Sequence, residues 1–214
     1  MTVEAARMKT AVLSCCLLAL GAAPPTSQPA NPATLAIGEI VSNKAAIRSY
    51  TFDVHVKVVM HSFPWLRFHL DGVGRYDRNG PFVVHFIHVP WFGKGFETIS
   101  LAAIDPEGWP KKYDLELVER HGDRSVLALH DRVRGHIKSV RATVDARAGL
   151  REVLWQYENG GVIHLTVEPT TVQGFQFPAL DSAEISVPAV KATAQGEFSN
   201  YHVIADQPTT TQAR

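Results

Sequence analysis

Apolar and polar residues alternate with a period of two along residues 51–89. The stretch 51–61, TFDVHVKVVMH, places Asp53, His55 and Lys57 largely on the side opposite its apolar residues. The stretches 66–76 and 81–89 repeat the alternation, and RNGP at 78–81 has turn composition. Because successive side chains of a strand point to opposite faces, this period predicts three antiparallel strands with one apolar face. On the first strand that face comprises Phe52, Val54, Val56, Val58 and Met60.

A helical pattern precedes the strands. Asn31 followed by Pro32 suits a helix start, as a cap and a first helical position. The segment that follows has a spacing of three and four between apolar residues, which predicts one amphipathic helix of about three to four turns. Its apolar face comprises Ile37, Ile40, Val41 and Ala45.

Short strands are predicted over most of the rest of the chain. They fall at 113–120, 125–131, 137–145, 150–158, 161–168 and 172–177, with weaker candidates over 183–203. HGD at 121–123, DARAG at 145–149 and NG at 159–160 are the turns between them. One helix followed by about nine to eleven short antiparallel strands indicates a meandering barrel or sandwich. The connection 91–112 is long for such a fold, so we expect it to be functional, with ETISLAAI as a candidate short helix.

Composition narrows the functional classes. Apolar residues make up 45% of the 214 residues and charged residues 20%, which is typical of a globular protein of one domain. Lysine plus arginine equals aspartate plus glutamate at 21 each, so no basic excess favours nucleic acid as a partner.

The first residues have the pattern of a secretory signal peptide. Lys9 precedes an apolar run from Ala11 to Ala23, which is shorter than the ~20 residues of a membrane-spanning helix. We therefore expect residues 1–23 to be a signal peptide, 24–33 a flexible lead-in, 34–204 a single domain and 205–214 a disordered tail. We therefore also expect the protein to be exported and to have no integral membrane segment once the signal peptide is cleaved.

Both cysteines, Cys15 and Cys16, lie inside this peptide. The cleaved protein would then have neither a disulfide nor a thiol nucleophile. An alternative is a membrane-anchored lipoprotein with a lipid on Cys15 or Cys16, because LSC loosely resembles a lipidation motif.

His85 and His88 have the H-x-x-H spacing of a helical metal site. In a strand, residues three apart point to opposite faces, so the two imidazoles cannot share one ion. A register with Lys57 opposite Asp71 would place His55 about 10 Å from His85, which is also too far for shared coordination. We expect no metal and no cofactor.

Catalytic motifs are missing from the sequence: it has no G-x-S-x-G, H-E-x-x-H or C-x-x-C. Asp105 and Glu107 in IDPEGWP could be paired carboxylates, but a turn capped by Asp105 is the simpler interpretation. We therefore expect no catalytic residues and no enzymatic activity.

Aromatic residues around the third strand and the long connection are the remaining candidates for a binding site. Gly72 and Gly74 on the presumed inner face would leave space inside the sheet. Simple core packing and an apolar ligand cavity are both consistent with this pattern. The candidate ligand-binding residues are Phe82, Val84 and Phe86 in the concavity, with Trp91 and Phe92 at its rim.

The order of these segments resembles the LolA/LolB-like superfamily of bacterial envelope proteins. The resemblance lies in the signal peptide and helix before IRSYTFDVHVKVVM, in LDGVGRYDRNGPFVVHF, in LAAIDPEGWPKKYDLELVER, in IKSVRATVDARAGLREVLWQYENGGVIHLTVE and in the closing GFQFPAL. It covers about residues 33–203 and contains no motif from which a ligand-binding residue can be transferred. It implies a mainly β (α+β) fold, in which a strongly curved antiparallel sheet forms an incomplete barrel. The N-terminal helix, and a second one if present, would cover the concave face.

The resemblance also implies a function. The expected protein is a periplasmic, non-catalytic binding protein for a lipid or an acylated protein. The alternative is an envelope sensor or interaction domain that binds a protein partner, and an enzyme of unknown type ranks third.

Overall fold

The computed structural model describes residues 31–63, 66–80, 82–87, 89, 98–101, 104–132 and 135–206. The expected signal peptide at 1–23 and most of the expected tail lie outside this part of the chain. The elements in chain order are α1 (Pro32–Lys44), β1 (Ile47–Met60), β2 (Arg67–Asp77), β3 (Val83–Ile87), β4 (Thr98–Ser100), the 3-10 helix η3 (Pro106–Gly108), α2 (Trp109–Lys112), β5 (Tyr113–His121), β6 (Arg124–Asp131), β7 (Ile137–Asp145), β8 (Gly149–Tyr157), β9 (Val162–Val172), β10 (Phe175–Val187) and β11 (Val190–Ala205).

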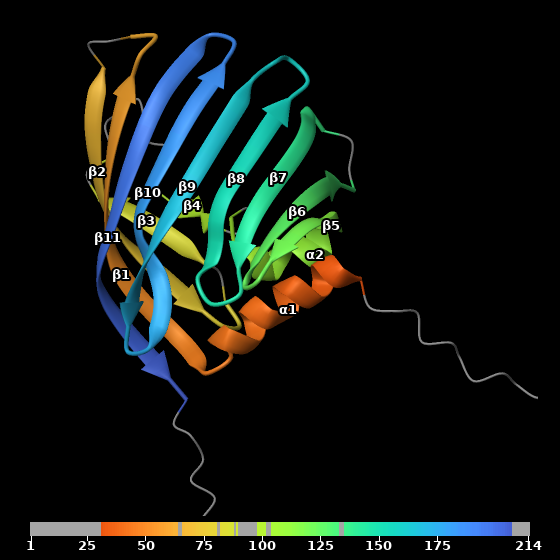
Figure 1. The fold of residues 1–214 in the computed structure, drawn as a ribbon. Coiled ribbons are helices and arrows are strands. Elements are labelled where there is room, and N and C mark those ends of the chain that lie inside the picture. Colours follow the sequence, from red (N-terminus) through yellow and green to blue (C-terminus); the bar gives the residue numbers. More distant parts are fainter. Residues whose placement is uncertain are drawn as a thin grey trace, which may run out of the picture.

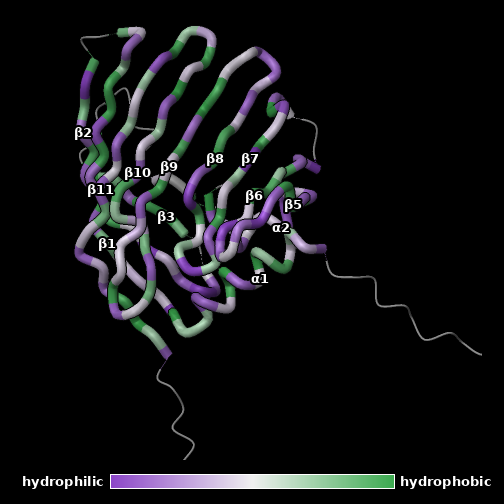
Figure 2. Tube along the Cα trace, in the orientation of Figure 1, coloured by the Kyte–Doolittle hydropathy of each residue, from purple (hydrophilic) through white to green (hydrophobic). Residues whose placement is uncertain are grey.

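The strands form one antiparallel sheet in the order β4-β3-β2-β1-β11-β10-β9-β8-β7-β6-β5. Within the described residues its two ends, β4 and β5, do not pair with each other, so the sheet stays open. It is strongly curved, and α1 lies across one end of the concave side (Figure 1). Apolar and polar positions alternate along the long strands (Figure 2). The predicted fold class, an incomplete antiparallel barrel with an N-terminal helix, is confirmed.

The helix α1 begins where the sequence indicates. Asn31 is its N-cap, and Asn31 Oδ1 accepts a hydrogen bond from the Ala33 N–H at 2.9 Å. Ile37 and Ile40 are buried as predicted, but Val41 remains 41% exposed, and Ala45 is an exposed residue that caps the end of the helix. The prediction was wrong for Val41 because the buried face turns towards Ala33 and Ala36 instead.

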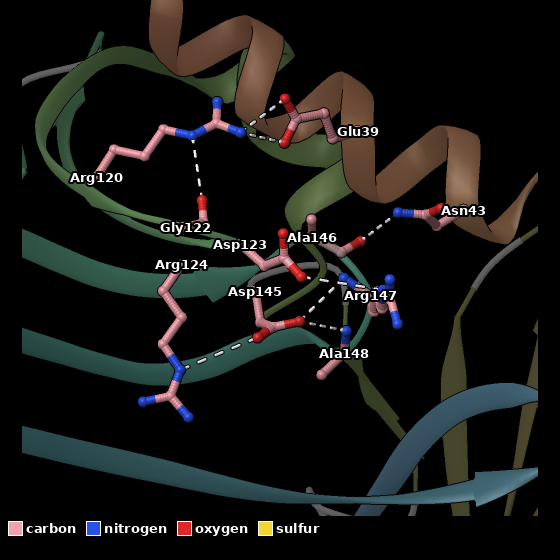
Figure 3. A network of polar contacts seen from close by, with 10 residues as sticks. All are labelled: Glu39, Asn43, Arg120, Gly122, Asp123, Arg124, Asp145, Ala146, Arg147 and Ala148. Carbon is pink, nitrogen blue, oxygen red and sulfur yellow. Dashed lines mark hydrogen bonds and ion pairs between the residues drawn. The ribbon is translucent and has the colours of Figure 1, made fainter.

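Polar contacts attach α1 to the turns of the sheet (Figure 3). Glu39 accepts hydrogen bonds from Arg120, with each carboxylate oxygen 2.9 Å from Arg120 Nη2. Asn43 Nδ2 donates to the Ala146 carbonyl at 2.9 Å. Asp145 holds the β7–β8 turn, because its Oδ1 accepts hydrogen bonds from the backbone N–H groups of Arg147 and Ala148 at 3.0 Å each. These contacts tie the helix to the β5–β6 and β7–β8 turns.

Two sequence predictions of local structure were wrong. The segment 172–177 is not one strand, because Gln173 and Gly174 adopt positive φ angles of 51° and 84° and form the turn between β9 and β10. The candidate helix at ETISLAAI is replaced by β4, whose Thr98 pairs with His85 of β3. The weak strands predicted over 183–203 belong to two long strands, β10 and β11.

Two packed clusters occupy part of the concave side. The first lies under α1 and α2 and includes Ile40, Trp109 and Leu127, each at most 1% exposed. The second is largely aromatic and lies over β1, β2 and β3, with Phe177 of β10 among its most buried members. Neither cluster extends to the far end of β1 and β11, where the concave face is left open. No described helix is long and apolar enough to cross a membrane.

Candidate functional site

An apolar cavity of about 530 Å³ lies on the concave face where the packed clusters end. Its walls come from β1, β2, β3, β10 and β11. The lining residues are Val54, Val56, Val58, Met60, Leu66, Phe68, Leu70, Val84, Phe86, Leu101, Asp181, Ile185, Val190, Ala192, Ala194 and Phe198.

Strand alternation creates this surface. Val54, Val56, Val58 and Met60 are successive inward positions of β1 and line the cavity together. At ~3.3 Å per residue, the six steps from Val54 to Met60 give the cavity a floor of about 20 Å. Val56 lies between Leu70 of β2 and Gly196 of β11, so the side chains become smaller from β2 to β11 along this row. The volume falls in the range of about 300–1,000 Å³ that is typical of ligand pockets.

The candidate ligand-binding residues occupy different places. Val84 and Phe86 line the cavity, and each is less than a tenth exposed. Phe82 is half-buried, packs against the aromatic cluster and lines a second, smaller cavity. Trp91 and Phe92 lie outside the described residues.

Aromatic rings pack together beside the inner side of the large cavity. Tyr50 packs against Tyr76 and Phe177 with ring centroids 4.8 Å and 4.9 Å apart, and Phe52 stacks on Tyr201 at 5.4 Å. Such offset and edge-on pairs add stabilisation beyond their buried area. We call these rings the aromatic partition, and three of them, Tyr50, Phe52 and Tyr201, line the smaller cavity.

The smaller cavity, of about 80 Å³, lies on the inner side of this partition. Leu101, Asp181 and Phe198 line both cavities, so the two adjoin. The smaller one has more polar walls, which include Lys44, Tyr50, Asp105 and Tyr201.

Asp181 is the only carboxylate among the described residues that line the large cavity. It sits on the inward face of β10 between Val167 of β9 and Gly196 of β11. Both carboxylate oxygens lie over Gly196, where a Cβ atom would collide with Oδ1. Burial raises the pKa of Asp181 to about 6, and a hydrogen bond from the backbone of Gly196 opposes this shift.

Asp105 and Glu107 lie in the turn that the sequence predicts. Their carboxyl groups are also partly buried, which the sequence does not indicate. Asp105 caps η3, and its Oδ1 accepts from the Glu107 N–H at 3.3 Å. Glu107 Oε2 accepts from the Tyr76 hydroxyl at 3.2 Å. Burial raises the pKa of each carboxyl, and for Glu107 the charge of Asp105 adds to the increase. Each group thus has a structural partner that accounts for its position.

The histidines of the convex face pair with neighbours. His55 lies opposite Asp71, with Nδ1 2.5 Å from Oδ1, and His85 contacts Thr98 Oγ1 at 3.0 Å. The predicted register of Lys57 opposite Asp71 was wrong by two residues, because His55 takes the place opposite Asp71. Among the described residues, no three His, Cys, Asp or Glu side chains are grouped to hold a metal ion. His88 lies outside them.

Sequence reasoning missed the β10–β11 wall and Asp181. Ala192, Ala194 and Ile185 were inside weak strand candidates, whose small and polar residues hide the alternation. The inward residues of β1 were available as a signal, because their apolar alternation is strict. Nothing local in PALDSAEISV shows that Asp181 faces inward, since only its pairing with Val167 and Gly196 decides this.

Comparison with known proteins supports the fold. No family model and no curated protein match the sequence. A LolA superfamily protein of Nitrosomonas europaea is similar in structure, with a TM-score of 0.55 at 12% identity over 85% of this chain and 97% of that one. An outer-membrane lipoprotein-sorting protein domain of Vibrio parahaemolyticus matches with a TM-score of 0.56 at 8% identity, over 85% of this chain and 95% of that one. A DUF1329 family protein of Desulfovibrio piger matches with a TM-score of 0.55 at 9% identity, over 81% of this chain and 93% of that one.

These chains are covered almost completely, so the likeness concerns the whole folded unit rather than one motif. At these identities it is the architecture that is shared. The chain therefore has the LolA-like fold, an incomplete antiparallel barrel with a helix across its concave side.

Proposed function

We propose that this protein is a non-catalytic binding protein that receives the acyl chain of a lipid or lipidated protein. The observation that carries the proposal is the apolar cavity of about 530 Å³ beside an otherwise packed concave face. Among the described residues that line it, Asp181 alone is polar. A polar substrate would lose its hydrogen bonds to water at such a surface and would find few partners there.

The expected driving force is the hydrophobic effect. Each methylene that leaves water contributes about 0.8 kcal/mol, so a long chain binds tightly without specific contacts. The floor of β1, about 20 Å long, suits an extended chain better than a compact ligand. The aromatic partition, with Tyr50 against Phe177, keeps the cavity from collapsing.

Location and partners follow from different observations. The signal pattern of residues 1–23 supports export, and we place the mature protein in the periplasm. The Vibrio parahaemolyticus domain is described as lipoprotein-sorting, which supports a lipidated protein as one class of ligand. Trp91 and Phe92 remain our proposed rim residues.

Mass spectrometry of the protein purified natively from a periplasmic extract tests the proposal directly. The expected result is a co-purifying acyl lipid or lipopeptide at close to one per protein. A binding assay in vitro should use a fluorescent palmitoyl probe, with displacement by unlabelled lipid.

A matched pair of variants locates the site. Ala194→Phe should fill the cavity and weaken probe binding about tenfold or more, because the new ring takes the place of the chain. Gln195→Phe adds the same ring one residue along β11 on the exposed face, and should leave binding unchanged. Equal affinity in both variants would show that the chain binds elsewhere.

A further inference from the structure

Polar residues lie beyond the inner side of the large cavity. It adjoins the smaller cavity through Leu101, Asp181 and Phe198, and the walls of the smaller cavity carry Lys44, Asp105 and two tyrosines. Together they make an amphipathic site, with a long apolar compartment and a small polar one. A ligand that fills both must itself be amphipathic.

Asp181 stands at the boundary between these compartments. Its neighbours in the same row across the sheet are Val167, Gly196 and Val56, none of which carries a charge or a hydroxyl. The missing side chain of Gly196 lets the carboxylate lean over β11, on the side of the cavity. A larger residue at 196 would exclude it from that position.

The geometry points to a ligand class: we propose that the site takes single acyl chains whose small head is uncharged and donates hydrogen bonds, with that head at Asp181. Hydroxyl and amide N–H groups have this chemistry, and a monoacylglycerol is the simplest example. Chains with an anionic head are excluded. This inference rests on the proposed function, because it assigns the polar end of the same ligand.

Charge explains the exclusion. The carboxylate of Asp181 would lie against a second negative charge inside a poorly hydrated cavity, where like charges repel strongly. Asp105 lines the same polar compartment and adds to the repulsion. Lys44 is the one cation among the described residues of that lining, and its charge already acts on both Asp105 and Glu107, where it opposes the increase of their pKa values by burial.

The remaining groups around Asp181 do not change this balance. Tyr201 of β11 is a neutral phenol whose pKa is raised, first by burial and then by the charge of Asp181. Its hydroxyl is engaged with the Pro178 carbonyl at 2.7 Å. The lining residues that β1, β2 and β3 contribute to the large cavity are all apolar. Asp181 is therefore the acceptor that remains for a donor on the ligand.

The test compares two probes with the same palmitoyl chain. 1-Monopalmitoylglycerol has a neutral head with hydroxyl donors, and N-palmitoyltaurine has a permanently anionic sulfonate. At about pH 8 the wild-type protein should bind the glyceride more tightly by about tenfold or more, as measured by displacement of a fluorescent probe. Equal affinity, or preference for the sulfonate, would overturn the inference.

Variants assign the selectivity to one residue. Asp181→Asn keeps the shape and removes the charge, so the preference should fall to within about threefold. Glu184→Gln removes a charge from the exposed face of the same strand and should keep the full preference. An unchanged preference in Asp181→Asn would assign the selectivity to other groups and overturn the inference.

A second measurement uses only the wild-type protein, in case Asp181→Asn folds poorly. The preference should shrink as the pH falls from 8 to about 5, because Asp181 takes up a proton near pH 6 while neither probe head titrates. A preference that does not change with pH contradicts the role of Asp181. If neither probe binds at any pH, the proposed function itself fails; binding without selectivity refutes only the assignment of the head.

Discussion

The ring of Phe52 on β1 lies directly over Gly74 of β2, its partner across the strands. A Cβ atom at Gly74 would overlap the ring, and one at Gly72 would come within 2.9 Å of Phe86. The glycines were expected to leave space inside the sheet, and the structure shows that aromatic rings take this space. The open cavity lies farther along β1, from Val54 to Met60.

Gly74→Ala should therefore destabilise the fold. The added methyl group forces Phe52 out of its place in the aromatic cluster, and overpacking of this kind costs about 1–3 kcal/mol. Urea denaturation should show the decrease in the free energy of unfolding.

Gly38→Ala is the matched control for this prediction. Gly38 lies inside α1, and a Cβ atom there meets nothing within 4 Å. The same substitution should stabilise the protein by about 0.5–1 kcal/mol through helix propensity. A loss of stability at both glycines would argue against a specific clash at Gly74.

Asn31 is expected to hold α1 in place by two separate bonds. Its Oδ1 caps the helix, and its Nδ2 donates to the Leu115 carbonyl of β5 at 2.8 Å. Asn31→Ala removes both and should lower the free energy of unfolding by about 1–2 kcal/mol. Asn31→Asp keeps the cap and removes the donor, so thermal unfolding of the two variants should separate the contributions. Identical melting temperatures for the two variants would mean that the cap contributes nothing, and a melting temperature of Asn31→Asp equal to that of the wild type would mean that the bond to β5 contributes nothing.

The hydrogen bond between Tyr76 and Glu107 attaches η3 and α2 to the sheet. Tyr76→Phe should destabilise the protein by about 1.5–3 kcal/mol, since the acceptor is charged and partly buried. The effect should be larger at about pH 8 than at about pH 4, because protonation of Glu107 weakens its role as acceptor. A double-mutant cycle with Glu107→Gln measures the coupling, and additive effects would refute it.

Asp181 should make stability fall as the pH rises. Its pKa is raised from 3.8 to about 6 in the folded protein, so between these values the native state holds more protons than the unfolded state. The free energy of unfolding therefore decreases through this window as the carboxyl ionises. Asp181→Asn should flatten this part of the stability profile, measured by urea denaturation from about pH 4 to pH 7, and should be the more stable form above pH 6. Parallel profiles for the two proteins would contradict the raised pKa.

The strands β1 and β2 could be predicted because apolar and polar residues alternate along most of their length, and β3 because branched and aromatic residues dominate it. The same pattern placed Val84 and Phe86 on the inward face, where they line the cavity. The register of β1 against β2 could not be predicted, because a shift of two residues leaves every side chain on the same face. His55 opposite Asp71 and Lys57 opposite Asp71 are both sensible pairs on the sequence alone.

The helix start, the turns and the presence of an apolar sheet face are consequences of local rules. A cap at Asn31, turn residues at 159–160 and a period of two act over a few residues, so the sequence alone predicts them. The place of the cavity and the inward carboxylate of Asp181 depend on which distant strands meet. Gly196 and Asp181 are partners only because β10 and β11 pair, and the cavity stays open only because the aromatic cluster packs at one end of β1. Those relationships arise from long-range packing, which no short stretch of the chain encodes.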